Sequence, residues 1–304
     1  MEHVIQTKDI TKKYGKATAV DNVSLTLNKG DIYGLIGKNG AGKTTLFKLL
    51  MGLAEPTSGS IEFFSDSSTM NANIVRKNIG FMMGSSFYPY LNAHDNLEYL
   101  RKVKGISDKN EVIRALKLVD LFGVKKKYGA FSMGMKQRLG IANALMGNPS
   151  IIILDEPING LDPEGINDIR KLIIKLNQEY GITFIVSSHI LGELSMMATR
   201  FGFIDNGVLI EELTHEQLLD KTTQSLIIKV DDVKKACLVL EQTLNTTSYL
   251  VTENNEIILS EYLDQPDVVA DALFKNNLRL SKLQINKTTL EDYFLSLIGG
   301  KQNA

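Results

Sequence analysis

The sequence predicts an α/β fold for residues 1–220 and a small α+β domain for residues 221–304. Two observations predict the first part. A short apolar strand, 31–36, runs into a glycine-rich turn and then into a segment with helical apolar spacing. Two further apolar runs, 150–154 and 182–186, are typical of strands buried on both faces of a parallel sheet. The second part is predicted by a change of pattern, after which short strands and helices follow one another.

The composition is that of a globular protein, with 43% hydrophobic and 23% charged residues among 304. A formal charge of −1 argues against a nucleic-acid partner, which usually requires a basic surface. The run Lys125-Lys126-Lys127 fits either a solvated loop or a local binding patch. The single cysteine, Cys237, has no intrachain disulfide partner, which fits a reducing cytosol. We find no secretory signal and no apolar stretch of roughly 18 residues, so we expect any membrane role to use a partner.

The segment Gly37-Lys38-Asn39-Gly40-Ala41-Gly42-Lys43-Thr44-Thr45 has the spacing G-x-x-x-x-G-K-[ST] between a predicted strand and a predicted helix. Glycines let backbone N–H groups turn inward, and the helix N-terminus adds a positive dipole end. We expect Lys43 to reach the β- and γ-phosphates of ATP and Thr44 to bind Mg²⁺. A tight turn before a helix would explain the glycines but not the Lys-Thr pair. The predicted nucleotide-binding residues of this loop are Gly37, Asn39, Gly40, Ala41, Gly42, Lys43, Thr44 and Thr45.

Two acids follow the apolar run 150–154. Asp155, at the carboxyl end of the strand, is predicted to hold Mg²⁺ directly or through water, and Glu156 to polarise the attacking water as a base. Successive residues of a strand point to opposite sides, which suits one acid to the metal and the other to the water. Capping of the next turn is the alternative interpretation, because Pro157 follows the pair.

The segment Phe131-Ser132-Met133-Gly134-Met135-Lys136-Gln137-Arg138 resembles the signature segment of ATP-binding cassette (ABC) ATPases, whose family form is Leu-Ser-Gly-Gly-Gln. Met133 and Met135 depart from that form, in a variant similar to the bacitracin and lantibiotic export subgroup. Taken alone, Ser132 is a good N-cap for a helix from Met133 to Met146, and Gly134 leaves the first turn open. The resemblance implies that Ser132 and Gly134 contact the γ-phosphate of ATP held by the other subunit of a head-to-tail homodimer.

Three further residues stand where this family has known motifs. Tyr14 would stack on adenine, Asp162 would lie along the dimer interface, and His189 would contact the γ-phosphate. Without the family, each has a plainer explanation as a packed turn tyrosine, a helix N-cap before Pro163, or a structural histidine. The resemblance covers residues 3 to 215. It implies a phosphate-loop ATPase core with a RecA-like subdomain, an antiparallel β subdomain and a helical subdomain at about 88–148, with Lys43, Glu156 and His189 as catalytic residues.

One position departs from the family. Most relatives have a Gln after the strand at 79–82 that touches Mg²⁺ and the water, and the bacitracin-like subgroup often has Glu, but Gly84 aligns there. A glycine has no side chain to act as a ligand. Ser85, Ser86 or a water could substitute, or the alignment could shift by one residue, and hydrolysis would then be slow.

In transport relatives the helical subdomain contacts a membrane subunit. Residues 92–128 have helical spacing. Phe87, Tyr88 and Tyr90 are the candidates for that contact, and burial in the core explains them equally well.

The C-terminal residues predict a βαββαβ order, which is that of a ferredoxin-like unit. It carries no phosphate, metal or nucleophile motif, so a dimer-stabilising or regulatory role is a hypothesis that unchanged dimerisation and ATPase rate after deletion of 221–304 would exclude. The expected elements are strands at 226–230, 249–252, 256–259 and 280–285, helices at 233–244 and 267–276, and a closing helix at 289–297.

The sequence therefore predicts the cytosolic ATPase subunit of an ABC exporter, peripheral on the inner face of the membrane. ATP and Mg²⁺ would close two copies, and a separate transmembrane permease would convert the motion into export, with antimicrobial peptides or drugs as the expected substrate. The alternatives are a non-transport ABC ATPase that acts on ribosomes or DNA and an ATP sensor with slow turnover. The single phosphate loop and the compact interval between loop and signature disfavour the first.

Overall fold

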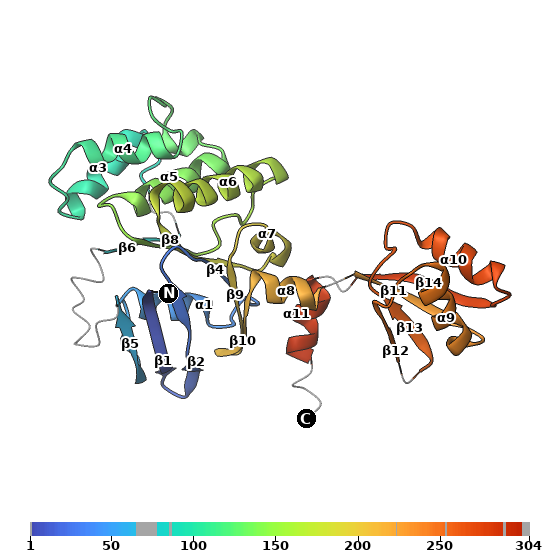
Figure 1. Cartoon of the computed structure of the whole chain (residues 1–304). Coiled ribbons are helices and arrows are strands. Elements are labelled where there is room, and N and C mark those ends of the chain that lie inside the picture. The colour runs from blue at the N-terminus through green and yellow to red at the C-terminus, as the bar shows by residue number, and fades with distance from the viewer. Residues whose placement is uncertain are drawn as a thin grey trace. The chain divides into compact units, whose positions relative to one another are not determined.

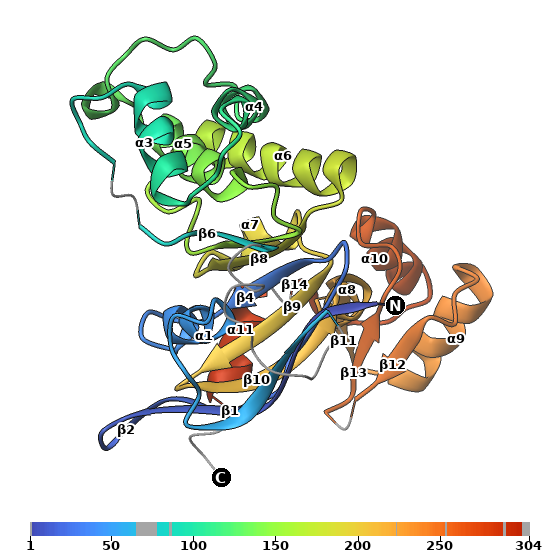
Figure 2. The ribbon, with the colours of Figure 1, turned by 90° about the vertical axis from the view of Figure 1, so that its left-hand side faces the viewer.

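The computed structural model describes residues 2–64, 78–84, 87–222, 224–252, 254–287 and 290–299. The chain forms two compact units, Met1–His215 and Glu216–Ala304 (Figures 1 and 2). The sequence places the domain boundary after residue 220, a few residues beyond the division between the units.

A six-stranded sheet forms the centre of the first unit, in the order β10-β9-β4-β8-β7-β6. Neighbours from β9 to β6 are parallel, and β10 closes the edge as an antiparallel hairpin with β9. Every residue of β4, β7 and β8 is buried, which confirms the parallel sheet predicted from their continuous apolar sequences. The strands are β4 (Ile32–Ile36), β6 (Ile79–Met82), β7 (Ile151–Leu154), β8 (Thr183–Ser188), β9 (Arg200–Asp205) and β10 (Val208–Thr214).

The first unit also contains an antiparallel sheet. Three of its strands come before β4 in the sequence, and the fourth comes between β4 and β6. Its strands are β1 (His3–Tyr14), β2 (Ala17–Val23), β3 (Thr26–Asn28) and β5 (Ser58–Phe63), with β1 pairing all three others. Ile5 and Ile10 of β1 join one hydrophobic cluster with Leu46 and Phe47 of α1 (Lys43–Leu50). Both sheets therefore pack against α1, and this packing fixes the helix that follows the glycine-rich loop.

Helices α3 (Ala93–Val103), α4 (Asn110–Leu118) and α5 (Met133–Leu145) pack together beside α6 (Pro163–Tyr180), as Figure 1 shows. The Arg138 side chain of α5 links them: it donates to Val119 O at 3.2 Å, to Asp120 Oδ2 at 3.1 Å and to Asp168 Oδ2 of α6 at 2.9 Å. The remaining short elements of this unit are the 3₁₀ turn η1 (Tyr128–Ala130) and α7 (Leu191–Ser195). Helix α8 (His215–Lys221) starts at the last residue of the first unit and otherwise belongs to the second.

The second unit contains an antiparallel sheet in the order β12-β13-β11-β14. Apolar residues of β11 and β13 share a hydrophobic cluster with α9 and α10, which gives the α+β fold that the sequence predicts. The elements are β11 (Gln224–Val230), α9 (Val233–Thr243), β12 (Tyr249–Val251), β13 (Glu256–Leu259), α10 (Pro266–Lys275), β14 (Leu280–Lys287) and α11 (Leu290–Gly299).

Candidate active site

The glycine-rich loop encloses the ammonium group of Lys43, the first residue of α1. This side chain is only 6% exposed, and its Nζ donates to the carbonyl oxygens of Gly37 at 2.6 Å and Lys38 at 3.3 Å. The buried cation and the N-terminus of α1 both favour negative charge at the same place. The loop is therefore suited to bind a phosphate chain.

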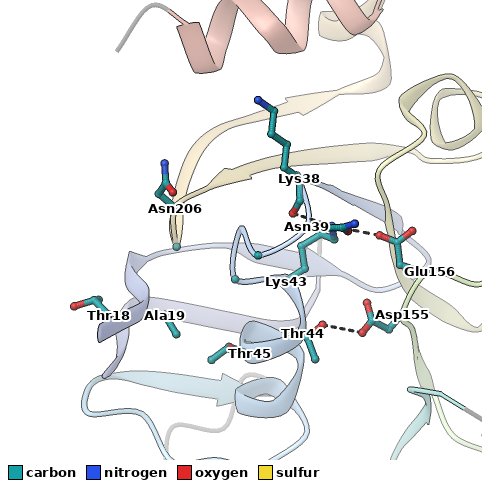
Figure 3. Close-up of a pocket in the computed structure, with 13 residues that line it drawn as sticks. Thr18, Ala19, Lys38, Asn39, Lys43, Thr44, Thr45, Asp155, Glu156 and Asn206 are labelled. Atoms are coloured by element: carbon teal, nitrogen blue, oxygen red, sulfur yellow. Dashed lines mark hydrogen bonds and ion pairs between the residues drawn. The ribbon is translucent and has the colours of Figure 1, made fainter. Parts of the chain in front are cut away.

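Thr44 and Asp155 face each other across the end of the sheet (Figure 3). The Thr44 hydroxyl donates to Asp155 Oδ2 at 3.0 Å, and the Ser187 hydroxyl of β8 donates to Asp155 Oδ1 at 2.7 Å. Both carboxylate oxygens of Asp155 are thus fixed by hydrogen bonds. Ser187 was not singled out from the sequence, because only the adjacency of β7 and β8 brings it to Asp155.

Glu156 adopts a left-handed backbone conformation with φ of 52°, which is uncommon for a residue with a long side chain. Its N–H donates to Ser187 Oγ at 2.9 Å. Its carboxylate lies between a lysine and a histidine: Oε1 is 3.3 Å from Lys43 Nζ, and Oε2 is 2.7 Å from His189 Nδ1. Since β7 ends at Leu154, the left-handed backbone, and not the pleat of a strand, separates Glu156 from Asp155.

Two glycines of the loop cannot be replaced without a clash. Gly42 has φ of 106°, and a Cβ on it would lie 2.5 Å from the carbonyl oxygen of Ala19. A Cβ on Gly37 would lie 2.5 Å from the carbonyl oxygen of Ile204. The loop is therefore pressed against both sheets of the first unit, and its shape depends on backbone contacts from distant segments.

The hairpin turn Asn206-Gly207 between β9 and β10 supports the loop from the side. Gly207 N donates to Ala41 O at 2.9 Å, and Gly207 O accepts from Asp21 N of β2 at 2.8 Å. At the other end of the hairpin, the Tyr33 hydroxyl donates to Glu212 Oε1 at 2.8 Å, where burial raises the pKa of Glu212. The hairpin thus joins the loop to the antiparallel sheet.

We expect Gly207→Ala to weaken ATP binding by roughly tenfold, because its φ is 80° and a Cβ would lie 2.9 Å from Ala19 O, so the turn must move away from the loop. Gly30→Ala is the matched control: its φ is 83°, but nothing lies within 4 Å of its Cβ. Calorimetric titration with ATP would measure both variants. Equal affinities in the two variants would contradict support of the loop by this hairpin.

The glycine-rich loop, the acid pair Asp155-Glu156 and the turn Asn206-Gly207 line a cavity of about 430 Å³ (Figure 3). Of the residues predicted from the sequence, it brings together Asn39, Gly40, Gly42, Lys43, Thr44, Thr45, Asp155 and Glu156. Gly37 and Ala41 contribute through carbonyl oxygens that accept from Lys43 and Gly207, and His189 joins through Glu156. Residues of the lining that were not predicted as binding residues from the sequence are Thr18, Ala19, Lys38, Asn206 and Gly207. The Asn-Gly pair between two apolar runs is a hairpin signal that could have identified the last two.

Four predicted residues lie away from this cavity. Tyr14, at the end of β1, is 51% exposed and has the Lys12 ammonium 5.2 Å from its ring centre. Ser132 accepts from Met135 N as the N-cap of α5, and Asp162 accepts from Gly165 N as the N-cap of α6. Gly134 leaves open space in the first turn of α5. The single chain therefore does not bring the signature segment to its own glycine-rich loop.

Gly84 has φ of 65° with open space around it, just after β6. Ser85 and Ser86, the suggested substitutes for a missing ligand, lie outside the described residues. Nearby, Phe87 packs on Tyr128 with ring centres 5.2 Å apart, whereas Tyr90 is 62% exposed. Of the three aromatic candidates, Phe87 therefore packs against another ring, whereas Tyr88 and Tyr90 are exposed.

A parallel sheet with a Lys-Thr glycine loop at the start of a helix, beside a carboxylate at the end of a neighbouring strand, defines a phosphate-loop nucleoside triphosphatase. A family model described as ABC transporter matches residues 20–159. The bacitracin transport ATP-binding protein BcrA of Bacillus licheniformis is 40% identical over 99% of both chains. This chain belongs to the ABC transporter family, as an ATP-binding subunit that couples ATP hydrolysis to transport.

Other relatives agree with this assignment. The lantibiotic transport ATP-binding protein SrtF of Streptococcus pyogenes is 40% identical over 70% of this chain and 92% of its own. Among solved structures, the dimeric ATP-binding cassette MJ0796 bound to ADP and phosphate is 28% identical, with a TM-score of 0.60 over 69% of this chain and 98% of that chain. Within the described ranges, we find no helix of a length and apolarity that would let it cross a membrane.

Proposed function

We propose that two copies of this chain close around two ATP molecules, each held by the glycine-rich loop of one copy and the α5 N-terminus of the other. The observation that carries this proposal is the position of Ser132: it caps a helix whose first turn is open, yet it lies outside the cavity of its own chain. Gly160 lies next to Met133, since a Cβ there would be 3.9 Å from the Met133 methyl group. The loop before Asp162 and the α5 N-terminus thus form one surface.

Within one copy, we assign Lys43 to the β- and γ-phosphates and Glu156 to the attacking water. The Glu156 carboxylate lies 3.3 Å from Lys43 Nζ, so phosphate oxygens bound to Lys43 would replace Glu156 as its partner and leave Oε1 to accept a proton from water. His189 Nδ1, 2.7 Å from Oε2, would donate to the carboxylate and hold it in place, and the protonated ring would also donate from Nε2 toward the γ-phosphate. Tyr14 remains our candidate for adenine stacking.

The oxygen donors of Thr44 and Asp155 fit Mg²⁺, which prefers few protein ligands and keeps waters and substrate phosphates as the others. When bound there, the ion would neutralise charge on the phosphate oxygens. Ser187 would keep Asp155 oriented toward it.

Mixing two inactive variants tests the shared site. Lys43→Ala disables the loop of one copy and Ser132→Arg the helix tip of its mate, so a mixed dimer keeps one complete site. Random pairing should restore about a quarter of the parent ATPase rate. A mixture of Lys43→Ala and Glu156→Gln is the control, because both changes disable the copy that carries them and leave no complete site. If the first mixture recovers no more activity than the control, each chain works alone.

We further propose that the dimer sits on the inner face of the cell membrane through a separate permease. The exposed Tyr88 and Tyr90 support a contact there. The names of BcrA and SrtF, which refer to bacitracin and lantibiotic transport, support a peptide antibiotic as the exported substrate. The strand order of the second unit supports a ferredoxin-like accessory domain, as the sequence suggests.

Gly84 favours a slower variant of the same cycle, in which ATP closes the dimer and hydrolysis seldom resets it. A parent protein that binds ATP but releases no measurable phosphate would support that sensor-like function.

A further inference from the structure

The helical subdomain, residues 88–148, has a charge that the rest of the chain does not share. It carries eleven Lys and Arg against five Asp and Glu, an excess of six positive charges in a chain whose formal charge is −1. The remainder therefore has an excess of seven negative charges. This separation of positive and negative charge does not help to form a core. It does orient a protein in the electric field of a charged partner.

The arginines of this subdomain are all paired with carboxylates. Arg101 pairs with Glu98 at 2.7 Å, Arg114 pairs with Glu111 at 2.8 Å, and Arg138 holds Asp120 and Asp168. Among these described residues, the lysines other than Lys102 have no carboxylate at ion-pair distance. The unneutralised charge is thus entirely lysine, which acts as a mobile point charge and not as a geometrically fixed fork.

Lys125, Lys126 and Lys127 are the densest part of this charge, and all three are exposed. They precede Tyr128, whose N–H donates to Leu91 O at 2.8 Å, while Lys127 forms an isolated bridge with Asn92. The lysine run therefore emerges beside the segment that carries the exposed tyrosines. Those tyrosines contact one another, with Tyr88 5.6 Å from Tyr90 and 5.1 Å from Tyr99 between ring centres.

We propose that the Lys125–Lys127 run binds the anionic phospholipid surface of the membrane, at the edge of the permease contact that Tyr88 and Tyr90 support. A negatively charged membrane creates a diffuse potential, which the side chains of three exposed consecutive lysines can all enter. Tyrosine rings with one polar end suit the headgroup level of a bilayer. The proposal rests on the proposed function, because the permease is what brings this face to a membrane.

Sedimentation of the purified full chain with lipid vesicles tests this proposal. We expect binding to vesicles that contain phosphatidylglycerol, no binding to phosphatidylcholine alone, and loss of binding as salt rises. Each lysine near a charged membrane is worth about 1 kcal/mol, so changing Lys125, Lys126 and Lys127 to Gln should weaken binding about a hundredfold. Inorganic phosphate at equal ionic strength should compete no better than chloride.

Changing Lys234, Lys235 and Lys275 to Gln is the matched control, since it removes the same charge from exposed positions of the second unit. It should change vesicle binding by less than about twofold. Equal losses in the two variants would show an effect of net charge, and failure of the parent chain to bind would also overturn the proposal. If vesicles are ignored but the Lys125–Lys127 variant loses its complex with the permease, the run binds an acidic protein segment instead. ATP binding by the same preparations should be measured as well, because it does not depend on vesicle or permease binding. A protein that binds ATP but not vesicles would contradict the lipid proposal and leave the proposed function standing.

Discussion

Glu156→Gln should lower the rate of ATP hydrolysis by roughly a hundred- to ten-thousandfold, because an amide cannot accept the proton of the attacking water. ATP affinity should not fall. The Glu156 carboxylate lies 3.3 Å from Lys43 Nζ, where it would compete with phosphate for that cation, and the amide removes the competing charge. The variant should therefore accumulate as an ATP-bound dimer, which size exclusion with and without ATP would detect.

The control for this experiment is Glu179→Gln, which removes the same charge from an exposed position near the end of α6. Its hydrolysis rate and its elution should match those of the parent. Full activity in Glu156→Gln would exclude Glu156 as the general base. Asp155 would then be the next candidate for that role.

Lys43→Ala should raise the dissociation constant of ATP by roughly a hundred- to twenty-thousandfold. Hydrogen bonds to charged groups contribute about 1.5–3 kcal/mol each, and the ammonium would be shared by two phosphate groups. The loss is large because Lys43 is buried inside the loop, where no other cation of the described lining takes its place: Lys38 points away from Asp155 and Glu156 in Figure 3.

Calorimetric titration of Lys43→Ala should be compared with Lys48→Ala, an exposed lysine on the same helix that should bind ATP like the parent. Thermal unfolding of both variants would show whether the loop itself has collapsed. A Lys43→Ala variant that folds and binds ATP normally would mean that the phosphates lie outside this loop.

Local patterns in the sequence were sufficient for the parts of this molecule that are built from consecutive residues. The strand, glycine loop and helix around Lys43, the buried strand before Asp155, and the capped helix at Ser132 all have the structure that their patterns predict. In each case the residues that determine the conformation are within a few positions of one another, so periodicity and capping chemistry contain the necessary information.

The supports of the site could not be found in the same way. Ser187 fixes both acids from a strand more than 30 residues further along the chain, and Gly207 touches Ala41 from a hairpin whose place depends on the sheet order. The left-handed backbone at Glu156 also has no sequence signal, since a glutamate rarely adopts it. These features follow from tertiary contacts, which no local pattern encodes.

Arg138 couples three helices of the first unit to one another. It is the sixth residue of α5 and binds Asp168, the sixth residue of α6, while also gripping the end of α4 through Val119 O. Sliding either helix along the other would break a charge-assisted bond in a partly shielded place. A displacement of α5 is thus expected to move α6 with it. The helix N-termini at Ser132 and Asp162 would then move together as one rigid unit.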